Sequence, residues 1–362
     1  MTFSQILLSG WNALLEYLSA HVLTCLVPAF FIAGAISALL PKEHITKHLG
    51  PEAPRPKAYL FSVMAGLLLA VCSCTVLPLF AGIKKKGAGI GPAIAFLYTA
   101  PATNILAILF TGSVLGWDFA FSRIVLSIGF AVLTGIIISG LFPHEEENCE
   151  PVESLLEEQK NLEGIKKMSL RQKIDELVRK KLLVFFVTLF AILIFGASKI
   201  EGGIKIPVLL GLIIVLLLQL KFRFQKEEIL SWLTETYNFF KMIFPLLLIG
   251  IFVAGMLGAI FPRNYLGRYV GTNTLGSNLL AVLFGLFMYF PTLVEVPMAK
   301  MFLGLGVAKG PLLAYLLADP VISLPSILVV RKIMGSKRTL VYMILITAFC
   351  TLSGLIYGVF VK

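Results

Sequence analysis

The chain has 362 residues, of which 58% are hydrophobic and only 14% are charged, whereas soluble domains average about 25% charged residues. A soluble protein of this composition could not cover its surface with polar groups, so the sequence indicates a lipid-embedded chain. The formal net charge of +11 does not indicate nucleic-acid binding, because Lys and Arg occur in short clusters between apolar runs, as in membrane loops.

Ten apolar runs are candidate transmembrane helices, since roughly 20 apolar residues are needed to cross the hydrocarbon core as a helix. Helices are expected because an irregular backbone cannot face lipid. The stretch 2–18 is predicted to be an amphipathic helix at the membrane interface. No Lys or Arg precedes Lys42, so we expect no cleavable signal peptide. The predicted spans are 19–40, 58–83, 88–115, 119–141, 182–198, 204–220, 239–261, 277–303, 306–330 and 339–361.

Residues 142–181 differ from the rest of the chain in charge. They hold ten of the twenty acidic residues and eight of the thirty-one basic residues. Such a mixed-charge stretch must lie in water, so we predict a partly helical cytoplasmic linker. A solvated tether without chemistry explains this composition as well as a functional segment does.

The chain also matches itself. With a shift of 219 residues, glycines and prolines of the region 58–101 coincide with those of 277–320, and a shift of 221 aligns the preceding segments. Chance would not place so many of these residues in register, so we predict a first membrane repeat (1–141) and a second (222–362). The charged linker (142–181) and a connecting helical hairpin (182–221) join them. The charge distribution leaves open whether the repeats run parallel or inverted. Matching pairs include Gly66 with Gly285, Pro78 with Pro297, Pro92 with Pro311, Pro101 with Pro320, and Trp11 with Trp232.

The predicted fold is all-α: a polytopic membrane protein of about ten transmembrane helices, in two related halves, with helices that Pro and Gly interrupt. Secondary transporters built in this way bind substrate near the bilayer midplane, where interrupted helices of the repeats meet. Proline removes a backbone donor and frees a carbonyl one turn back, so segments around four prolines are candidate substrate-binding sites. These are Pro78, Pro101, Pro297 and Pro320.

Cys72 and Cys74 form the most informative pair of side chains. Thiolates are soft ligands that select soft metals and metalloids. On a regular helix residues at i and i+2 do not share a face, so the two thiols could converge only if the segment unwinds near Pro78. The alternative is that both are small buried hydrophobic residues. Two cysteines are too few for a closed zinc site, and we predict no metal centre and no cofactor.

Two carboxyls lie inside apolar runs. Glu295 lies within Tyr289–Met298, and Asp319 directly precedes Pro320. A charge inside a span is costly unless paired or hydrated, so such residues mark ion pathways, proton relays or ion pairs. We predict proton coupling, the alternative being a fixed ion pair with Lys300 or Lys309.

Two polar side chains beside Pro101, Thr99 and Asn104, are candidate substrate ligands. Side chains of this kind also hydrogen-bond membrane helices to one another. The sequence leaves both interpretations open.

The segment Cys72-Ser73-Cys74 to Pro78 resembles the ArsP-type permease family. The basic turn Lys84-Lys85-Lys86, the motif Gly91-Pro92 to Ala95-Phe96, and Ala100-Pro101-Ala102-Thr103-Asn104 follow the same family pattern. The likeness covers nearly the whole chain outside the linker. Characterised members of this family expel trivalent organoarsenicals, so the resemblance implies that Cys72 and Cys74 could ligate trivalent arsenic.

The expected function is that of a multi-pass permease of the cell membrane. It would expel trivalent organoarsenicals or another small thiophilic solute by alternating access, driven by an ion (proton) gradient. Two alternatives stay open: a permease for a different small anion or sulfur compound, and a membrane subunit that needs a soluble partner. No phosphate-binding loop, nucleophile elbow or HExxH motif occurs, so no enzyme is predicted. The expected partners are the lipid bilayer and a small solute, with homo-oligomerisation left open.

Overall fold

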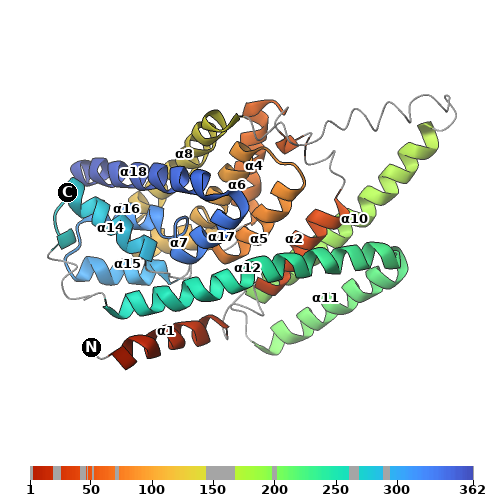
Figure 1. Ribbon diagram of the computed structural model, residues 1–362, viewed down its shortest axis with the longest axis horizontal. Helices are drawn as coiled ribbons and strands as arrows, with labels where there is room; N and C mark the ends of the chain where they lie inside the picture. The colour runs from red at the N-terminus through yellow and green to blue at the C-terminus, as the bar shows by residue number, and fades with distance from the viewer. Residues whose placement is uncertain are drawn as a thin grey trace.

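The computed structural model describes residues 3–18, 26–40, 46, 48–50, 53–69, 73–143, 168–197, 202–260, 269–287 and 294–361. Every regular element in these ranges is a helix, as hydrocarbon requires, because a helix satisfies its own backbone groups. The molecule is elongated, and the start of α1 and the end of α18 lie at the same end of it (Figure 1).

The helices before the charged linker are α1 (Phe3–Tyr17), α2 (Val27–Leu39), α4 (Arg55–Leu69), α5 (Ser73–Lys85), α6 (Ile90–Ala102), α7 (Ile105–Val114) and α8 (Trp117–Leu141). Those after it are α10 (Met168–Ala197), α11 (Gly202–Arg223), α12 (Lys226–Ile260), α14 (Leu275–Phe287), α15 (Glu295–Gly304), α16 (Lys309–Ala318), α17 (Leu324–Met334) and α18 (Ser336–Phe360).

Four predicted spans each contain two helices, so their prediction as single intervals is wrong. The interval 88–115 holds α6 and α7, and 306–330 holds α16 and α17. The intervals 58–83 and 277–303 are divided in the same way, into α4 with α5 and α14 with α15. Proline explains one break well: Pro101 cannot donate a backbone hydrogen bond, and α6 ends one residue later. Helices α6 and α7 are bent by 45° relative to each other.

Three helices are long and apolar enough to cross a membrane: Trp117–Leu141, Lys226–Met256 and Ser336–Phe360. The bent pair Ile90–Ala102 and Ala107–Val114 makes a fourth if it counts as one span. Shorter apolar helices cover Val27–Leu39, Lys181–Gly196 and Leu275–Phe287. These helices are those of a membrane protein, but the predicted number of ten spans is not confirmed.

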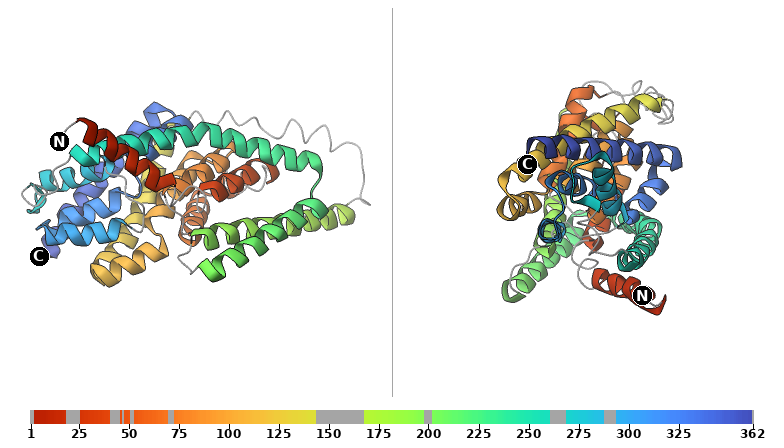
Figure 2. Two further views of the ribbon diagram at one scale, coloured as in Figure 1. Left: turned by 90° about the horizontal axis from the view of Figure 1, so that it is seen from below. Right: turned by 90° about the vertical axis from the view of Figure 1, so that its left-hand side faces the viewer.

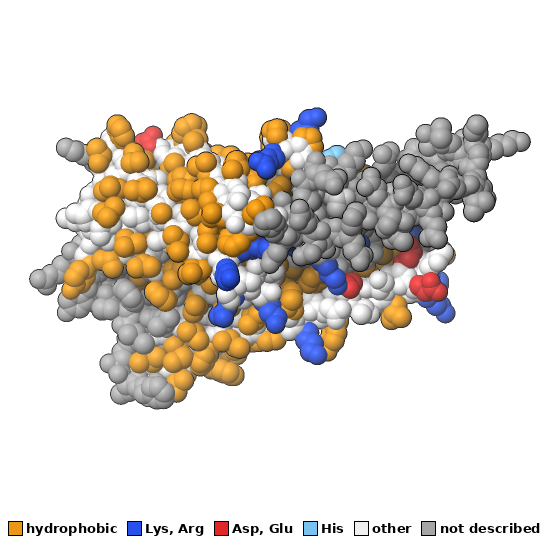
Figure 3. All heavy atoms as spheres, turned by 45° about the horizontal axis from the view of Figure 1, so that its top comes forward, with side chains coloured by type: hydrophobic (Ala, Val, Ile, Leu, Met, Phe, Trp, Pro, Cys, Tyr) orange, Lys and Arg blue, Asp and Glu red, His pale blue; other side chains and the backbone are white. Residues whose placement is uncertain are grey.

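The outer surface carries the apolar side chains that lipid would contact. Helix α8 exposes Phe121 and Val125, and α18 exposes Ile344 and Ile356. Figure 3 shows hydrophobic side chains over one end of the molecule, with Lys and Arg gathered near the middle of the same face. Large apolar surfaces of this kind mark membrane contact in a folded protein.

Small residues allow the helices of each half to pack closely. A Cβ added to Gly91 in α6 would lie 2.9 Å from the carbonyl oxygen of Gly135 in α8, so only glycine fits there. The crossing of α16 and α18 is equally tight, because a Cβ on Gly310 would lie 2.6 Å from the carbonyl oxygen of Gly354. Close backbone approach through small residues is typical of membrane helices.

The ends of these helices coincide under the shift found in the sequence. Helices α8 and α18 begin and end at positions 219 residues apart. The described glycines with positive φ form two pairs with the same separation, Gly87 (φ 88°) with Gly306 (φ 86°), and Gly116 (φ 112°) with Gly335 (φ 84°).

The region between the halves forms a hairpin of α10 and α11 that extends from the bundle (Figure 2). Gln219 Nε2 in α11 donates to Thr188 Oγ1 in α10 at 2.8 Å and holds the two helices together. Of the predicted linker, residues 144–167 lie outside the described residues, and 168–181 are the first turns of α10.

Candidate functional site

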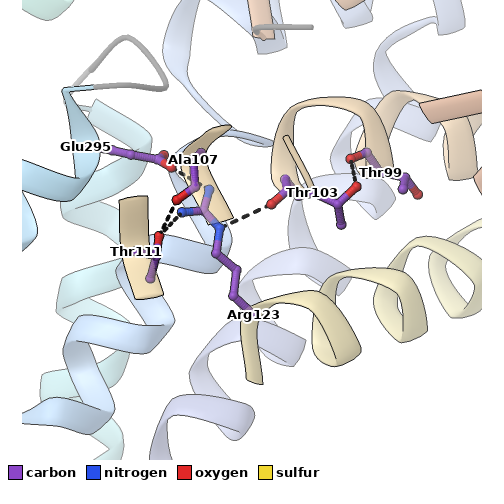
Figure 4. A network of polar contacts seen from close by, with 7 residues as sticks. Thr99, Thr103, Ala107, Thr111, Arg123 and Glu295 are labelled. Carbon is purple, nitrogen blue, oxygen red and sulfur yellow. Dashed lines mark hydrogen bonds and ion pairs between the residues drawn. The ribbon is translucent and has the colours of Figure 1, made fainter. Parts of the chain in front are cut away.

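A buried ion pair joins the two membrane regions. Arg123 in α8 pairs through Nη2 with the Oε1 atom of Glu295 in α15, and both side chains are 0% exposed. The other guanidinium nitrogens are also used: Nε donates to the carbonyl oxygen of Ala102 at 3.1 Å, and Nη1 donates to Thr111 Oγ1 at 3.3 Å (Figure 4). One side chain of α8 therefore links the end of α6, the middle of α7 and the start of α15.

The ion pair lies where helices are interrupted. Ala102 is the last residue of α6, and the last carbonyls of a helix have no partner within it. A cation is favourable at this negative end of the helix dipole, so Arg123 satisfies both the carbonyl and the dipole. Glu295 is the first residue of α15, where a negative charge is favourable for the opposite reason.

Asp319 is a second buried carboxylate beside this pair. It follows the last residue of α16 and is 2% exposed. Neither of its carboxylate oxygens has a hydrogen-bond partner among the described residues, and the same holds for Oε2 of Glu295. Asp319 lies close enough to Glu295 and Arg123 for their charges to interact with its own. A negative charge at the C-terminal end of a helix is unfavourable, so nothing described here compensates an ionised Asp319.

The charges of this cluster, Arg123 with Glu295 and Asp319, do not cancel. One guanidinium faces two carboxylates, which leaves one negative charge in surplus if all three groups are ionised. A buried charge without a partner costs several kcal/mol. The cluster is therefore suited to hold one additional positive charge, such as a proton. Among the described residues, no group of three or more His, Cys, Asp and Glu could hold a metal ion.

The hydroxyls near Pro101 bond to their own helix. Thr99 Oγ1 donates to the carbonyl oxygen of Ala95 at 2.7 Å, and Thr103 Oγ1 donates to that of Thr99 at 2.8 Å. Asn104 is buried at the break between α6 and α7. Thr99 and Asn104 thus lie beside the residue whose carbonyl binds Arg123, and each threonine hydroxyl keeps its oxygen as an acceptor for a solute.

The thiol segment is a separate part of the fold. Cys74 is buried in the first turn of α5, and Pro78, four residues later, cannot donate to its carbonyl. Helix α5 packs against α2, α6 and α17, whereas the charged cluster is built on α7, α8, α15 and the end of α16. Cys72 lies outside the described residues, so its convergence with Cys74 stays a prediction.

The prolines of the second half have different surroundings. Pro297 lies in the first turn of α15 with an exposed side chain, at a position where the missing N–H costs little. Pro320 is buried and directly follows Asp319. Pro320 therefore borders the charged cluster, whereas Pro297 starts the helix that carries Glu295.

Sequence reasoning missed Arg123, although a signal was available. It is the only basic residue between Lys86 and Lys160, and the rule that selected Glu295 and Asp319 applies to it equally. The ion-pair alternative for Glu295 named Lys300 or Lys309, but the observed partner is Arg123.

Comparison with known proteins gives a consistent result. The family described as "Predicted permease" (ArsP_1) matches residues 7–359. The UPF0718 protein MJ0584 of Methanocaldococcus jannaschii is 36% identical over 97% of this chain and 95% of its own length. The UPF0718 protein YraQ of Escherichia coli K12 is 22% identical over 96% of this chain and 80% of its own.

A shorter similarity, 30% identical over 35% of this chain and 48% of the relative, is to a Streptococcus mutans protein named "Putative two-component membrane permease complex subunit". No solved structure matches.

Proposed function

This chain belongs to the ArsP_1 family of predicted permeases, and on that premise we propose that it carries a small solute across the cell membrane in exchange for protons. The family indicates a membrane permease, and a transporter rather than an enzyme. Alternating access, with the cavity open to one side of the membrane at a time, is the mechanism that we assign to it.

The observation that carries the proposal is the buried charged cluster. Arg123 comes from the region before the linker, and Glu295 and Asp319 come from the region after it. Intramembrane charges of this kind are costly to keep and mark proton relays and ion pathways in transporters. A surplus negative charge at the contact between two helical regions supports a coupling site that takes up and releases a proton as they move.

The two membrane regions are proposed to be structural repeats. The coinciding ends of α8 and α18 and the two pairs of positive-φ glycines support this division of the chain. In repeat-built transporters the substrate and coupling-ion sites lie where interrupted helices of the repeats meet. The ends of α6 and α16 are such positions, and the cluster lies beside both.

The proposed cargo is a trivalent organoarsenical or another thiophilic solute, moved outward. The support is chemical: Cys74 is a soft ligand at the start of a proline-containing helix, with Cys72 two residues earlier in the chain. Thr99 and Asn104 supply polar atoms at the break after α6.

Transport in inverted membrane vesicles tests this function. Purified protein, or vesicles from cells that express it, would be offered a panel of trivalent and pentavalent arsenicals, with and without a proton gradient. We expect gradient-dependent accumulation of the trivalent organic compounds alone. Absence of transport for every compound, by folded protein in sealed vesicles, would exclude this cargo.

A matched pair of variants tests the thiol ligands. Cys74→Ser is expected to abolish arsenical transport, and Cys350→Ser serves as control because Cys350 is also buried but lies in α18, away from α5. If the Cys72→Ser/Cys74→Ser double variant transports arsenicals as well as the wild type does, the thiols do not bind the cargo. Transport of another small anion or sulfur compound by that double variant favours the alternative cargo.

A second candidate function is that of a membrane subunit that acts with a soluble partner. The name of the Streptococcus mutans relative favours it for that protein, and the highly charged residues 142–181 are the natural docking segment here. Replacing residues 144–167 with a neutral flexible linker of equal length separates the two functions. Loss of transport with the spans intact supports the subunit, and unchanged transport excludes this segment as its docking site.

A further inference from the structure

The cluster contains one guanidinium and two carboxylates that compete for it. Arg123 is bound to Glu295, while Asp319 is buried and its two carboxylate oxygens have no partner among the described residues. Helix α8, which carries Arg123, packs directly against α16, whose end carries Asp319. Both carboxylates therefore lie near the same guanidinium, but only one of them is paired.

We propose that Asp319 is the alternate partner of Arg123, and that the guanidinium moves from Glu295 to Asp319 when Asp319 loses a proton. In the conformation described here Asp319 carries that proton, and Arg123 with Glu295 forms a neutral pair. After deprotonation Asp319 is the stronger competitor, because its charge otherwise stays uncompensated at the C-terminal end of α16. The role of this exchange in transport rests on the proposed function, whereas the exchange itself can be tested without transport.

The surroundings of Asp319 limit which groups can take part. The charged and titratable side chains that interact with it are Arg123 from α8, Glu295 from α15 and Tyr315 from its own helix. Arg123 is the only cation of this set, so it alone can compensate the ionised carboxylate. One guanidinium shared by two carboxylates exchanges one proton in each cycle, and Glu295 acts as a positioning residue.

The remaining bonds of Arg123 permit the exchange. Its contacts with Ala102 and Thr111 are hydrogen bonds to neutral oxygens, at 3.1 Å and 3.3 Å. Such bonds are weaker than those between two charged groups. A guanidinium that changes carboxylates would shift the start of α15 relative to the end of α16. These helices are consecutive in the chain and are joined at Gly306, which has a positive φ.

A double-mutant cycle on thermal unfolding in detergent tests the shared guanidinium. In Glu295→Gln, Arg123 re-pairs with Asp319, so we expect a modest loss of Tm. In Asp319→Asn, a neutral side chain replaces a neutral protonated one, so Tm should change little. The double variant leaves Arg123 buried without any carboxylate, and its Tm should fall by about 5 °C or more beyond the sum of the single effects.

Additive effects would overturn the proposal, because they would mean that Asp319 does not take the guanidinium when Glu295 is removed. A Glu295→Gln variant that fails to fold, beside a stable Asp319→Asn variant, would overturn it for the same reason.

A second measurement reports the proton itself. The infrared difference between wild type and Asp319→Asn should contain the band of a protonated carboxyl, and this band should vanish in the Glu295→Gln background. A band of equal strength in both backgrounds would contradict the exchange. A non-additive cycle in a protein that moves no protons would leave the shared guanidinium standing and remove the proposed function.

Discussion

The broken helices α6 and α16 occupy equivalent places but end with opposite electrostatics. The last carbonyl of α6 accepts a hydrogen bond from Arg123, whereas α16 ends beside Asp319, a carboxylate at the negative end of the helix dipole. Under the shift of 219 residues Arg123 corresponds to Tyr342, and Asp319 corresponds to Ala100. The surroundings of the two breaks are alike, and the charged residues at them are not.

The difference separates residues that build the scaffold from residues that carry chemistry. Glycines at the crossing of α6 and α8 recur at the crossing of α16 and α18. The polar side chains at these crossings differ: Tyr59 lies against Gly91, whereas Asn273 lies against Gly310. A proton-coupled transporter needs complementary charges across its two moving parts, which a symmetric pair of sites would not supply.

The largest expected effect comes from removing the charge that distinguishes the end of α6. Arg123→Gln leaves Glu295 buried without a cation and the carbonyl of Ala102 without its donor. Breaking a buried ion pair by removing one partner costs about 3–5 kcal/mol. We expect a large drop in Tm or a loss of folded protein, measured by size-exclusion chromatography and thermal unfolding in detergent. A variant as stable as the wild type would show that the ion pair does not hold the two regions together.

Intermediate effects should be equal in the two halves if the scaffold is repeated. Gly116 and Gly335 precede α8 and α18 with positive φ and ψ near 152° and 162°, a backbone conformation almost restricted to glycine. Gly116→Ala and Gly335→Ala should each cost about 1–3 kcal/mol in thermal or denaturant unfolding.

Gly129→Ala is the control for this pair, because an added Cβ at Gly129 in α8 has no atom within 4 Å among those described. It should be neutral or slightly stabilising, by up to about 1 kcal/mol. Strong destabilisation by only one of the two positive-φ substitutions would break the proposed equivalence of the halves.

The smallest effect is expected at the position that corresponds to Arg123. The hydroxyl of Tyr342 is buried and has no hydrogen-bond partner among the described residues. Removing an unsatisfied buried group costs little or stabilises, so Tyr342→Phe should change the unfolding free energy by less than about 1 kcal/mol. A loss comparable to that of Arg123→Gln would show that α18 carries a polar contact equivalent to that of α8.

The sequence predicted the character of the fold better than the extent of its helices. Composition and apolar runs predicted an all-helical membrane protein, and the proline positions predicted where helices are interrupted. Four intervals were nevertheless predicted as single spans, because hydropathy continues across a break that only backbone geometry reveals. Interval 88–115 is an example: it is apolar throughout, yet α6 ends at Ala102.

The candidate site could be predicted only in part for a related reason. Charges in apolar runs singled out Glu295 and Asp319, and both are buried. Their partner lies 172 residues from Glu295 in the chain, and no periodicity within one sequence reports a contact at that separation. The rule for intramembrane charges could have selected Arg123 as a residue of interest, but not as the partner of Glu295.

Proton movement in sealed vesicles that contain the Asp319→Asn variant tests the central claim most directly. A pH-sensitive dye trapped inside would report protons while a trivalent organoarsenical is added outside, with wild type and Tyr342→Phe measured in parallel. Asp319→Asn should still let the solute equilibrate but without any accompanying pH change, while both references show one. A pH change in Asp319→Asn equal to that of the wild type would contradict a coupling role for this cluster.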